Sequence, residues 1–314
     1  MKYLLERIKK TGSSVCVGLD PILEYIPPSC KKLQSPGAHT IEAASADRIL
    51  DFTYGIIDAV HNIVPCVKLQ AAYYEMYGWR GMYAMTETVK HAKNMGLYVI
   101  IDGKRNDIGE TCKAYASAYL GDTIMIDGSK KRMYESDALT VNPYLGSDGI
   151  APFLIKCSKH DRDIFVLVKT SNQSASDFQD FIINPEKGIS LWEEVAMKCK
   201  EWNELPGMEE FITENGYGNC GVVVGATQIK QLEKVREMLP TSMILVPGYG
   251  AQGGAADYIA QGFNKDGTGA IVNASRSIMC AWQKNPEVPW QTAIREEAIR
   301  MTEDINSAVM RRYS

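Results

Sequence analysis

Short apolar runs recur along the chain and alternate with longer stretches in which apolar residues return every three or four positions. Runs of this kind, without polar alternation, are typical of parallel strands that are buried on both faces. Amphipathic segments such as 46–62 and 227–239 separate them, as helices would. We expect eight strands, at residues 14–19, 63–67, 98–101, 138–141, 164–168, 221–224, 243–246 and 270–272.

This alternation predicts an α/β protein, namely a (β/α)8 TIM barrel that forms a single catalytic domain over residues 1–314. Three connections are longer than such a barrel needs, at about residues 21–45, 121–136 and 172–219. The first of them is rich in proline and serine. We expect all three to be insertions in the top-face loops, as lids or short extra helices rather than separate domains.

Polar residues and glycines follow the predicted strands. Barrel enzymes build their active sites at this carboxyl end of the strands. The sequence therefore predicts one site assembled from Asp20, Lys68, Asp102 with Lys104, Asn142, Thr170 with Ser171, Gly225, Pro247 and residues 273–276.

The densest group of charges in this set is the run Val-Ile-Ile-Asp-Gly-Lys-Arg-Asn-Asp at residues 99–107. In a regular strand, Asp102 and Lys104 share one face while Arg105 turns away. Charges that face a barrel interior are costly unless opposite charges lie beside them. We therefore interpret Asp102 and Lys104 as chemical rather than structural residues.

Asp107 permits a simpler structural interpretation. It stands where a helix is expected to begin, and Glu110 follows three residues later. This spacing is typical of a capping box, worth about 1 kcal/mol.

A glycine-rich loop at residues 247–254 follows the seventh predicted strand, and Arg276 follows the eighth. Loops at these two places commonly bind phosphate in barrels of this type. Residues 248–253 also match G-x-G-x-x-G, but this motif alone is weak evidence for a dinucleotide fold and it occurs late in the chain. A glycine-rich turn without any ligand is a second alternative.

Composition narrows the possible partners. The net charge of −4 predicts no general attraction for nucleic acid or for an anionic membrane, and no apolar run is long enough to span a bilayer. The eight cysteines lack C-x-x-C spacing, which favours reduced thiols in a cytoplasmic protein. None of the four histidines stands at a predicted strand end, so we expect no metal centre.

Taken together, these motifs resemble the orotidine 5′-phosphate decarboxylase family, and most closely its longer-chain, type 2 branch. Gly103 and Gln70 depart from the usual pattern. The resemblance extends over nearly the whole chain and rests on residues 16–21 (CVGLDP), 67–68 (VK), 102–111 (DGKRNDIGET), 170–172 (TSN) and 247–253 (PGYGAQG), together with Arg276.

The resemblance implies decarboxylation of orotidine 5′-phosphate to uridine 5′-phosphate in de novo pyrimidine biosynthesis, without a cofactor or metal. Lys104 would protonate carbon 6, Asp102 would lie beside the leaving carboxylate, and Lys68 would hold the charges in place. A homodimer is implied, in which Asp107, Ile108 and Thr111 enter the neighbour's site. The remaining substrate contacts implied are Asp20 to the ribose, Thr170 and Ser171 to the pyrimidine, and Pro247, Gln252, Gly253 and Arg276 around the phosphate.

Three other interpretations of the same residues remain open at this stage. Asp102 and its neighbours could hold Mg²⁺ in a sugar-phosphate lyase, which would be sensitive to EDTA. Lys68 or Lys104 could form a Schiff base, which borohydride would trap. A barrel that only binds a nucleotide is the third, although clustered buried charges bring no advantage to such a protein.

Overall fold

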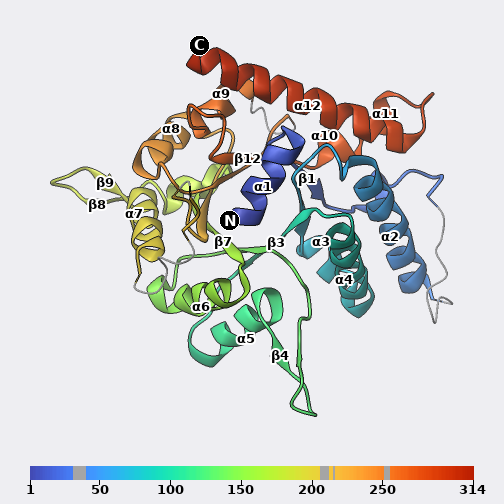
Figure 1. The fold of residues 1–314 in the computed structure, drawn as a ribbon, viewed down its shortest axis with the longest axis horizontal. Helices are drawn as coiled ribbons and strands as arrows, with labels where there is room; N and C mark the ends of the chain where they lie inside the picture. The colour runs from blue at the N-terminus through green and yellow to red at the C-terminus, as the bar shows by residue number, and fades with distance from the viewer. Residues whose placement is uncertain (31–39, 206–211, 215, 251–254) are drawn as a thin grey trace.

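Eight parallel strands close into a barrel at the centre of the molecule (Figure 1). The computed structural model describes residues 1–30, 40–205, 212–214, 216–250 and 255–314. Around the barrel the strands follow the order β1-β12-β11-β10-β7-β6-β3-β2, and the barrel closes between β2 and β1. Each strand is hydrogen-bonded to the strands before and after it in this order. Their bounds are β1 Val15–Leu19, β2 Cys66–Gln70, β3 Tyr98–Arg105, β6 Ala138–Val141, β7 Asp163–Lys169, β10 Cys220–Val224, β11 Ile244–Pro247 and β12 Ala270–Ala274.

Helices surround the strands, and two short hairpins extend from the ring. The α-helices are α1 Lys2–Thr11, α2 Ile41–Val60, α3 Ala72–Glu75, α4 Gly78–Asn94, α5 Gly109–Leu120, α6 Ala151–His160, α7 Leu191–Asn203, α8 Ile229–Met238, α9 Ala256–Ile259, α10 Arg276–Met279, α11 Ala281–Lys284 and α12 Trp290–Tyr313. The 3-10 turns are η1 Leu23–Tyr25, η2 Gly146–Gly149, η3 Gln173–Asp177 and η5 Ala260–Gly262. The hairpins pair β4 Thr123–Ile124 with β5 Lys130–Lys131, and β8 Ile182–Asn184 with β9 Ile189–Ser190.

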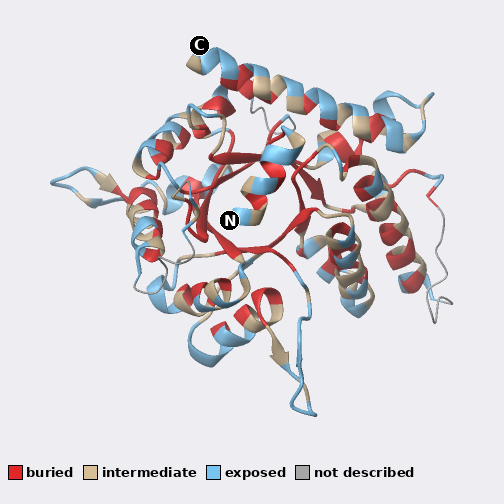
Figure 2. Cartoon of the chain, in the orientation of Figure 1, coloured by how far each residue is buried: buried red, intermediate tan, exposed pale blue. Residues whose placement is uncertain are grey.

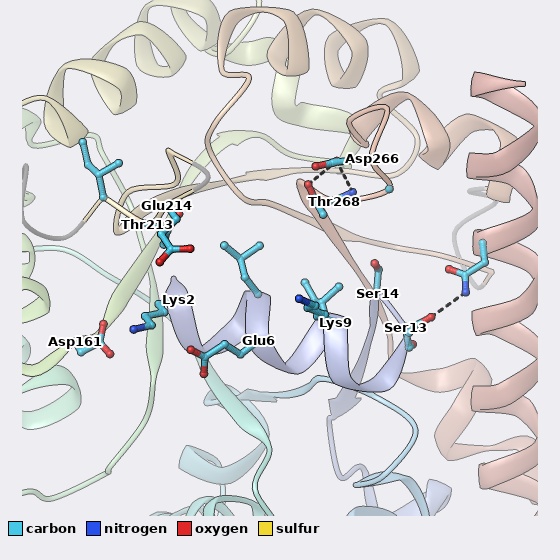
Figure 3. A pocket seen from close by; sticks show the side chains of 16 residues that line it. Lys2, Glu6, Lys9, Ser13, Ser14, Asp161, Thr213, Glu214, Asp266 and Thr268 are labelled. Atoms are coloured by element: carbon cyan, nitrogen blue, oxygen red, sulfur yellow. Dashed lines mark hydrogen bonds between the residues drawn. The ribbon is translucent and has the colours of Figure 1, made fainter.

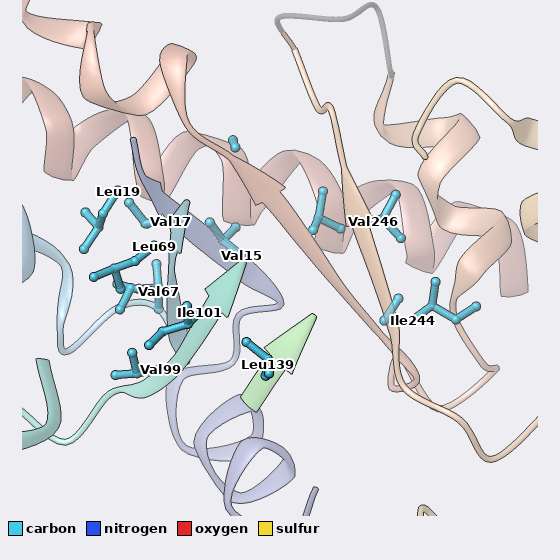
Figure 4. Packing of buried hydrophobic residues seen from close by; sticks show 14 of the residues in the cluster. Val15, Val17, Leu19, Val67, Leu69, Val99, Ile101, Leu139, Ile244 and Val246 are labelled. Carbon is cyan, nitrogen blue, oxygen red and sulfur yellow. The ribbon is translucent and has the colours of Figure 1, made fainter. Parts of the chain in front are cut away.

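Buried apolar side chains form two sets because strand residues alternate between the two faces of the barrel wall. One set, which includes Val15, Val17 and Leu19, points outward against the helices (Figure 4). The other set, with Tyr98 and Phe165, fills the interior. Buried residues therefore occur in every strand around the barrel (Figure 2).

Helix α1 closes the amino end of the barrel, the end that faces the viewer in Figure 1. Its Leu4 and Ile8 belong to the interior set. The Arg7 guanidinium donates to the carbonyl of His61, in the turn that precedes β2. With this end plugged, the carboxyl ends of the strands remain as the place for a site. Within the described ranges, no helix has the length and apolar character needed to cross a membrane.

The sequence-based strand predictions are confirmed, with two notable shifts. Strand β6 matches its prediction at both ends, whereas β2 begins three residues late, at Cys66 instead of residue 63. The N–H groups of Ile63 and Val64 instead donate to the Val60 carbonyl in a turn that ends α2, and Pro65 has no N–H to offer a neighbouring strand. Strand β3 continues four residues past its predicted end, to Arg105.

The long connections only partly match the expectation of top-face insertions. Residues 121–136 form the β4–β5 hairpin between α5 and β6, and such a connection lies at the amino ends of the strands, not at the top. Within residues 172–219, helix α7 packs against β7 and β10 as an ordinary barrel helix. Among the described residues of this stretch, the extra structure that directly follows β7 consists of η3 and the β8–β9 hairpin. In residues 21–45 the structure describes η1 and the start of α2, whose N-cap is Thr40.

Candidate active site

A group of charged side chains lies inside the barrel near the carboxyl ends of β2 and β3. Lys68 follows Cys66 on the inward face of β2, and Asp102 follows Ile100 on the inward face of β3. Both side chains are buried, with 3% and 8% of the residue surface exposed. Lys68, Asp102 and Lys104 were predicted to follow their strands; the structure places them within the strands.

The carboxylate of Asp102 accepts four hydrogen bonds. Its Oδ2 accepts from Lys68 Nζ at 3.0 Å and from Gln70 Nε2 at 3.1 Å. Its Oδ1 accepts from Lys104 Nζ at 2.6 Å and from the Thr140 hydroxyl at 2.8 Å. Gln70, which the sequence marks as a departure from the family pattern, is thus a direct partner of Asp102. Thr140 was not predicted, since a lone threonine inside a strand carries no functional signal in the sequence.

The backbone brings Lys104 to Asp102 by an irregularity of β3. Lys104 has φ +47°, one of three non-glycine residues with a positive φ in the described part of the chain, and the register between β3 and β6 shifts between Ile101 and Arg105. Regular strand alternation predicted a shared face for Asp102 and Lys104, and this prediction is wrong because β3 is irregular at Lys104. The Lys104 N–H instead donates to Thr140 Oγ1 at 2.9 Å. Arg105 turns away, as predicted, and donates to the Tyr119 hydroxyl.

Opposite charges favour the ionised forms of Asp102 and Lys68. Burial by itself raises the pKa of Asp102, but the ammonium groups of Lys68 and Lys104 outweigh it and hold that pKa well below its usual range. Burial lowers the pKa of Lys68, but the carboxylates of Asp102 and Asp20 outweigh it and leave that pKa raised. Asp20 Oδ1 lies 4.0 Å from Lys68 Nζ. A Schiff base needs a neutral amine, so this environment disfavours that chemistry at Lys68.

The hydrogen bonds that the Asp102 carboxylate accepts also affect whether it can bind a metal ion. Its two oxygens already accept from four protein donors, which leaves no lone pair directed at a cation. Within the described ranges, no group of three or more His, Cys, Asp or Glu residues is placed to hold a metal ion. The donor set at Asp102 therefore suits an internal ion pair better than Mg²⁺.

Asp107, Ile108 and Thr111 lie on the loop between β3 and α5 and at the first turn of that helix. Asp107 Oδ1 accepts from the Ile108 N–H at 2.8 Å. The predicted capping box is wrong, because α5 begins at Gly109, after a turn in which that glycine has φ +55°, and its N-cap is Ile108 without a side-chain cap. Ile108 and Thr111 are exposed. None of the described contacts joins these three side chains to the charged cluster of the same subunit.

Thr170 and Ser171 directly follow β7. The Thr170 N–H donates to Gln179 Oε1 at 3.0 Å, and Gln179 Nε2 donates to Thr170 Oγ1 at 2.8 Å. Ser171 lies against Gly225 at the end of β10, where a Cβ on the glycine would be 2.8 Å from Ser171 Cβ. Gln179 was not predicted, because its distance from the strand end hides it in the sequence.

The predicted phosphate end is only partly described. Pro247 is the last residue of β11, and Gly248 and Gly250 adopt φ +101° and +75°, which a side chain would strain. Gln252 and Gly253 lie outside the described residues. Arg276 begins α10, is exposed, and has its guanidinium carbon 6.0 Å from the ring centre of Tyr25.

Asn273 is a further polar residue beside this end. It lies on the inward face of β12, with 5% of its surface exposed. Its Oδ1, like Oδ1 of Asp20, is buried and has no hydrogen-bond partner among the described residues. Buried acceptors of this kind are costly unless a ligand or water supplies a donor. A donor-bearing ligand would therefore be favoured between these two strands.

A different cavity opens beside α1, at the opposite end of the barrel (Figure 3). Its volume is about 910 Å³, and residues of both charges line it, among them Lys2, Glu6, Lys9 and Asp266. The charged cluster of Lys68, Asp102 and Lys104 is not part of this lining. The cavity therefore does not coincide with the candidate active site.

Comparisons with known proteins point to one family. Residues 13–290 match the model of the "Orotidine 5'-phosphate decarboxylase / HUMPS family". The chain is 42% identical over 304 residues to the orotidine 5′-phosphate decarboxylase of Rhodopirellula baltica, covering 95% of this chain and 96% of that protein. It is 39% identical over 307 residues to the one of Caldicellulosiruptor bescii, with coverage of 98% and 97%. The structure of Leishmania donovani OMP decarboxylase superposes with a TM-score of 0.72 at 30% identity, covering 98% of both chains.

Proposed function

This chain belongs to the orotidine 5′-phosphate decarboxylase family, and on that premise we propose that it converts orotidine 5′-phosphate into uridine 5′-phosphate and carbon dioxide, a step of pyrimidine biosynthesis. The observation that carries the proposal is the ion pair between Lys104 and Asp102 at the top of the barrel, with Nζ and Oδ1 2.6 Å apart. In this proposal Lys104 supplies a proton to the substrate, and Asp102 repels the substrate carboxylate.

In the proposed reaction, the bond between carbon 6 and the substrate carboxylate breaks and its electron pair stays on carbon 6. The Lys104 ammonium stabilises this developing negative charge and then transfers a proton to carbon 6. The amine that remains regains its proton from solvent, since the Lys104 side chain is 45% exposed. No cofactor enters this balance.

Asp102 is proposed to act on the ground state. Its ionised carboxylate would lie beside the substrate carboxylate, and like charges repel at that distance. The repulsion falls as carbon dioxide leaves without charge, so it favours the transition state over the bound substrate. The four donors around Asp102 hold it ionised and in place for this role.

Lys68 and Asp20 are proposed to bind the ribose. Lys68 is fixed by Asp102 and lies beside Asp20. Asp20 Oδ1, which lacks a hydrogen-bond partner among the described residues, can accept from a ribose hydroxyl. Asn273 Oδ1 offers a second acceptor on the neighbouring strand β12.

We place the phosphate between the loop after β11 and the start of α10. Backbone N–H groups near Pro247 and Gly248 together with the Arg276 guanidinium suit an anion. Gln252 and Gly253 are proposed as further phosphate contacts because they belong to the family motif at residues 247–253. The phosphate lies away from the reacting carbon, and the binding energy of its contacts can be used to stabilise the transition state. Thr170 and Ser171 would face the pyrimidine.

We also propose a homodimer in which Asp107, Ile108 and Thr111 complete the neighbour's site. Ile108, Tyr144 and Leu145 have exposed fractions of 56%, 81% and 45%, so these side chains offer apolar surface that a second copy of the chain could cover. The cytoplasm remains the proposed location, because all eight cysteines are free thiols.

The direct test follows the ultraviolet absorbance of orotidine 5′-phosphate after addition of the purified protein, with and without EDTA. We expect conversion to uridine 5′-phosphate at the same rate in both. The absence of turnover would leave only nucleotide binding, and a loss of rate with EDTA would favour the metal-dependent alternative.

A further inference from the structure

We propose that Gln179 and Asp180 are positioning residues for the base-reading loop, defined as residues 170–172. This inference rests on the proposed function and refines it. It gives Thr170 a role inside the protein and keeps Ser171 as a proposed contact with the pyrimidine. Gln179 and Asp180 follow η3, and their side chains reach back to the end of β7.

The first of these contacts is an ion pair. Lys169, the last residue of β7, has 2% of its surface exposed, and its ammonium donates to Asp180 Oδ1 at 2.6 Å. A buried ammonium without a partner is strongly unfavourable. Asp180 is 43% exposed and has no need of a partner of its own. The ion pair therefore satisfies the buried ammonium of Lys169, and in doing so it holds Asp180 against the barrel.

The second contact is a pair of hydrogen bonds. The carboxamide of Gln179 accepts from the Thr170 N–H at 3.0 Å and donates to the Thr170 hydroxyl at 2.8 Å. That hydroxyl donates in turn to Asn172 Oδ1 at 2.6 Å. Both polar hydrogens of Thr170 are thus bound within the protein. Thr170 could donate a hydrogen bond to a substrate only by breaking these bonds.

Ser171 is held in place from the other side by β10. The Gly225 N–H donates to the Lys169 carbonyl at 2.9 Å, which draws the end of β10 against the end of β7. The missing side chain of Gly225 lets Ser171 lie directly on this strand end. With Thr170 tied to Gln179 and Ser171 supported by Gly225, the base-reading loop is preset before the substrate arrives. Presetting a loop lowers the entropy lost on binding.

This arrangement predicts which part of the ligand is affected when Gln179 changes. The loop lies at β7 and β10, whereas the proposed phosphate site lies at β11 and β12. Loss of the Gln179 contacts should therefore weaken ligands that carry the base and leave ligands without a base unaffected. A general loss of folding would weaken both.

The experiment compares Gln179→Ala with Gln173→Ala, an exposed glutamine of the same loop as the matched control. Titration calorimetry measures binding of uridine 5′-phosphate and of ribose 5-phosphate. For Gln179→Ala we expect uridine 5′-phosphate to bind about 10-fold more weakly, from the loss of two hydrogen bonds, with ribose 5-phosphate unchanged. Gln179→Glu keeps an acceptor for the Thr170 N–H and should recover most of the affinity. Gln173→Ala should match the wild type.

Amide hydrogen exchange gives a readout that needs no activity. The Thr170 N–H should exchange faster in Gln179→Ala than in the wild type, and Asp180→Asn should show a smaller change in the same direction, with Asp177→Asn as its control. Equal weakening of both ligands, or unchanged exchange at Thr170, would overturn the proposal. If wild-type protein failed to turn over orotidine 5′-phosphate while the exchange result held, the proposed function would fail and the positioning role would stand.

Discussion

Thr140 bonds to both Asp102 and Lys104. Its hydroxyl accepts from the Lys104 N–H at 2.9 Å and donates to Asp102 Oδ1 at 2.8 Å. Because Lys104 leaves regular strand geometry at φ +47°, its N–H would otherwise lack a partner on β6 at this point. One buried side chain thus stabilises the irregular backbone and orients the carboxylate.

Thr140→Val keeps the shape of the side chain and removes this bridge. We expect kcat to fall about 10-fold, since Asp102 loses one of its four donors, and stability to fall by about 1–3 kcal/mol, because the Lys104 N–H becomes unsatisfied. Initial rates and urea unfolding measure the two effects. Thr86→Val, which removes a hydroxyl bonded within helix α4, is the control and should leave kcat unchanged. A normal kcat in Thr140→Val would show that the bridge is not needed.

Lys104→Ala should abolish decarboxylation to within the detection limit, by at least about 100-fold in kcat, because it removes the proposed proton donor to carbon 6. The side chain is 45% exposed, so circular dichroism and the thermal midpoint should stay close to wild type. Lys113→Ala, another exposed lysine in an ion pair, serves as the control. Near-normal turnover by Lys104→Ala would contradict the assigned proton donor.

Arg276→Ala should raise KM and weaken binding of ribose 5-phosphate by about 10- to 100-fold, as expected when a charge-assisted contact is lost. Its kcat at saturation should fall less than kcat/KM. Arg132→Ala, on the hairpin at the amino end of the barrel, should change neither constant. If ribose 5-phosphate bound Arg276→Ala with wild-type affinity, the phosphate would have to lie elsewhere.

Two inactive variants test the shared site. Lys104→Ala and Asp107→Ala should each be impaired alone, but a mixture allowed to exchange subunits should recover about a quarter of the wild-type activity, because half of the dimers then contain one intact site. Size-exclusion chromatography checks whether each sample is dimeric. If the mixture were no more active than its components, Asp107 and Lys104 would belong to the site of the same subunit, or Asp107 would lie outside the site.

The ion pair at Asp102 also predicts a pH dependence of stability. Because the pKa of Asp102 is lower in the folded protein than in the unfolded chain, its ionisation stabilises the fold fully above about pH 4 and progressively less as the pH falls toward the folded value. The difference in unfolding free energy between wild type and Asp102→Asn should therefore shrink below about pH 4. Urea unfolding from pH 7 to pH 3 measures it. A difference that grew with acid would reverse the sign of the shift.

Much of the fold could be predicted from the sequence because strands buried on both faces leave uninterrupted apolar runs, and because the active end of a barrel collects polar residues at strand ends. Asp102, Lys104 and Lys68 were found in this way. The same local pattern placed β2 three residues too early, since it does not show that α2 ends in a turn that uses Ile63 and Val64.

The sequence by itself determined the barrel, the order of its strands along the chain and the charges of the candidate site, because these follow from local periodicity and residue type. Only the tertiary structure decided the partners of those charges. Gln70, Thr140 and Gln179 lie 32, 38 and 9 residues from the residues they bind, and the sequence does not show these partners, although it marks Gln70 as unusual. Hydrogen bonds depend on distance and direction in space, which separation along the chain does not encode.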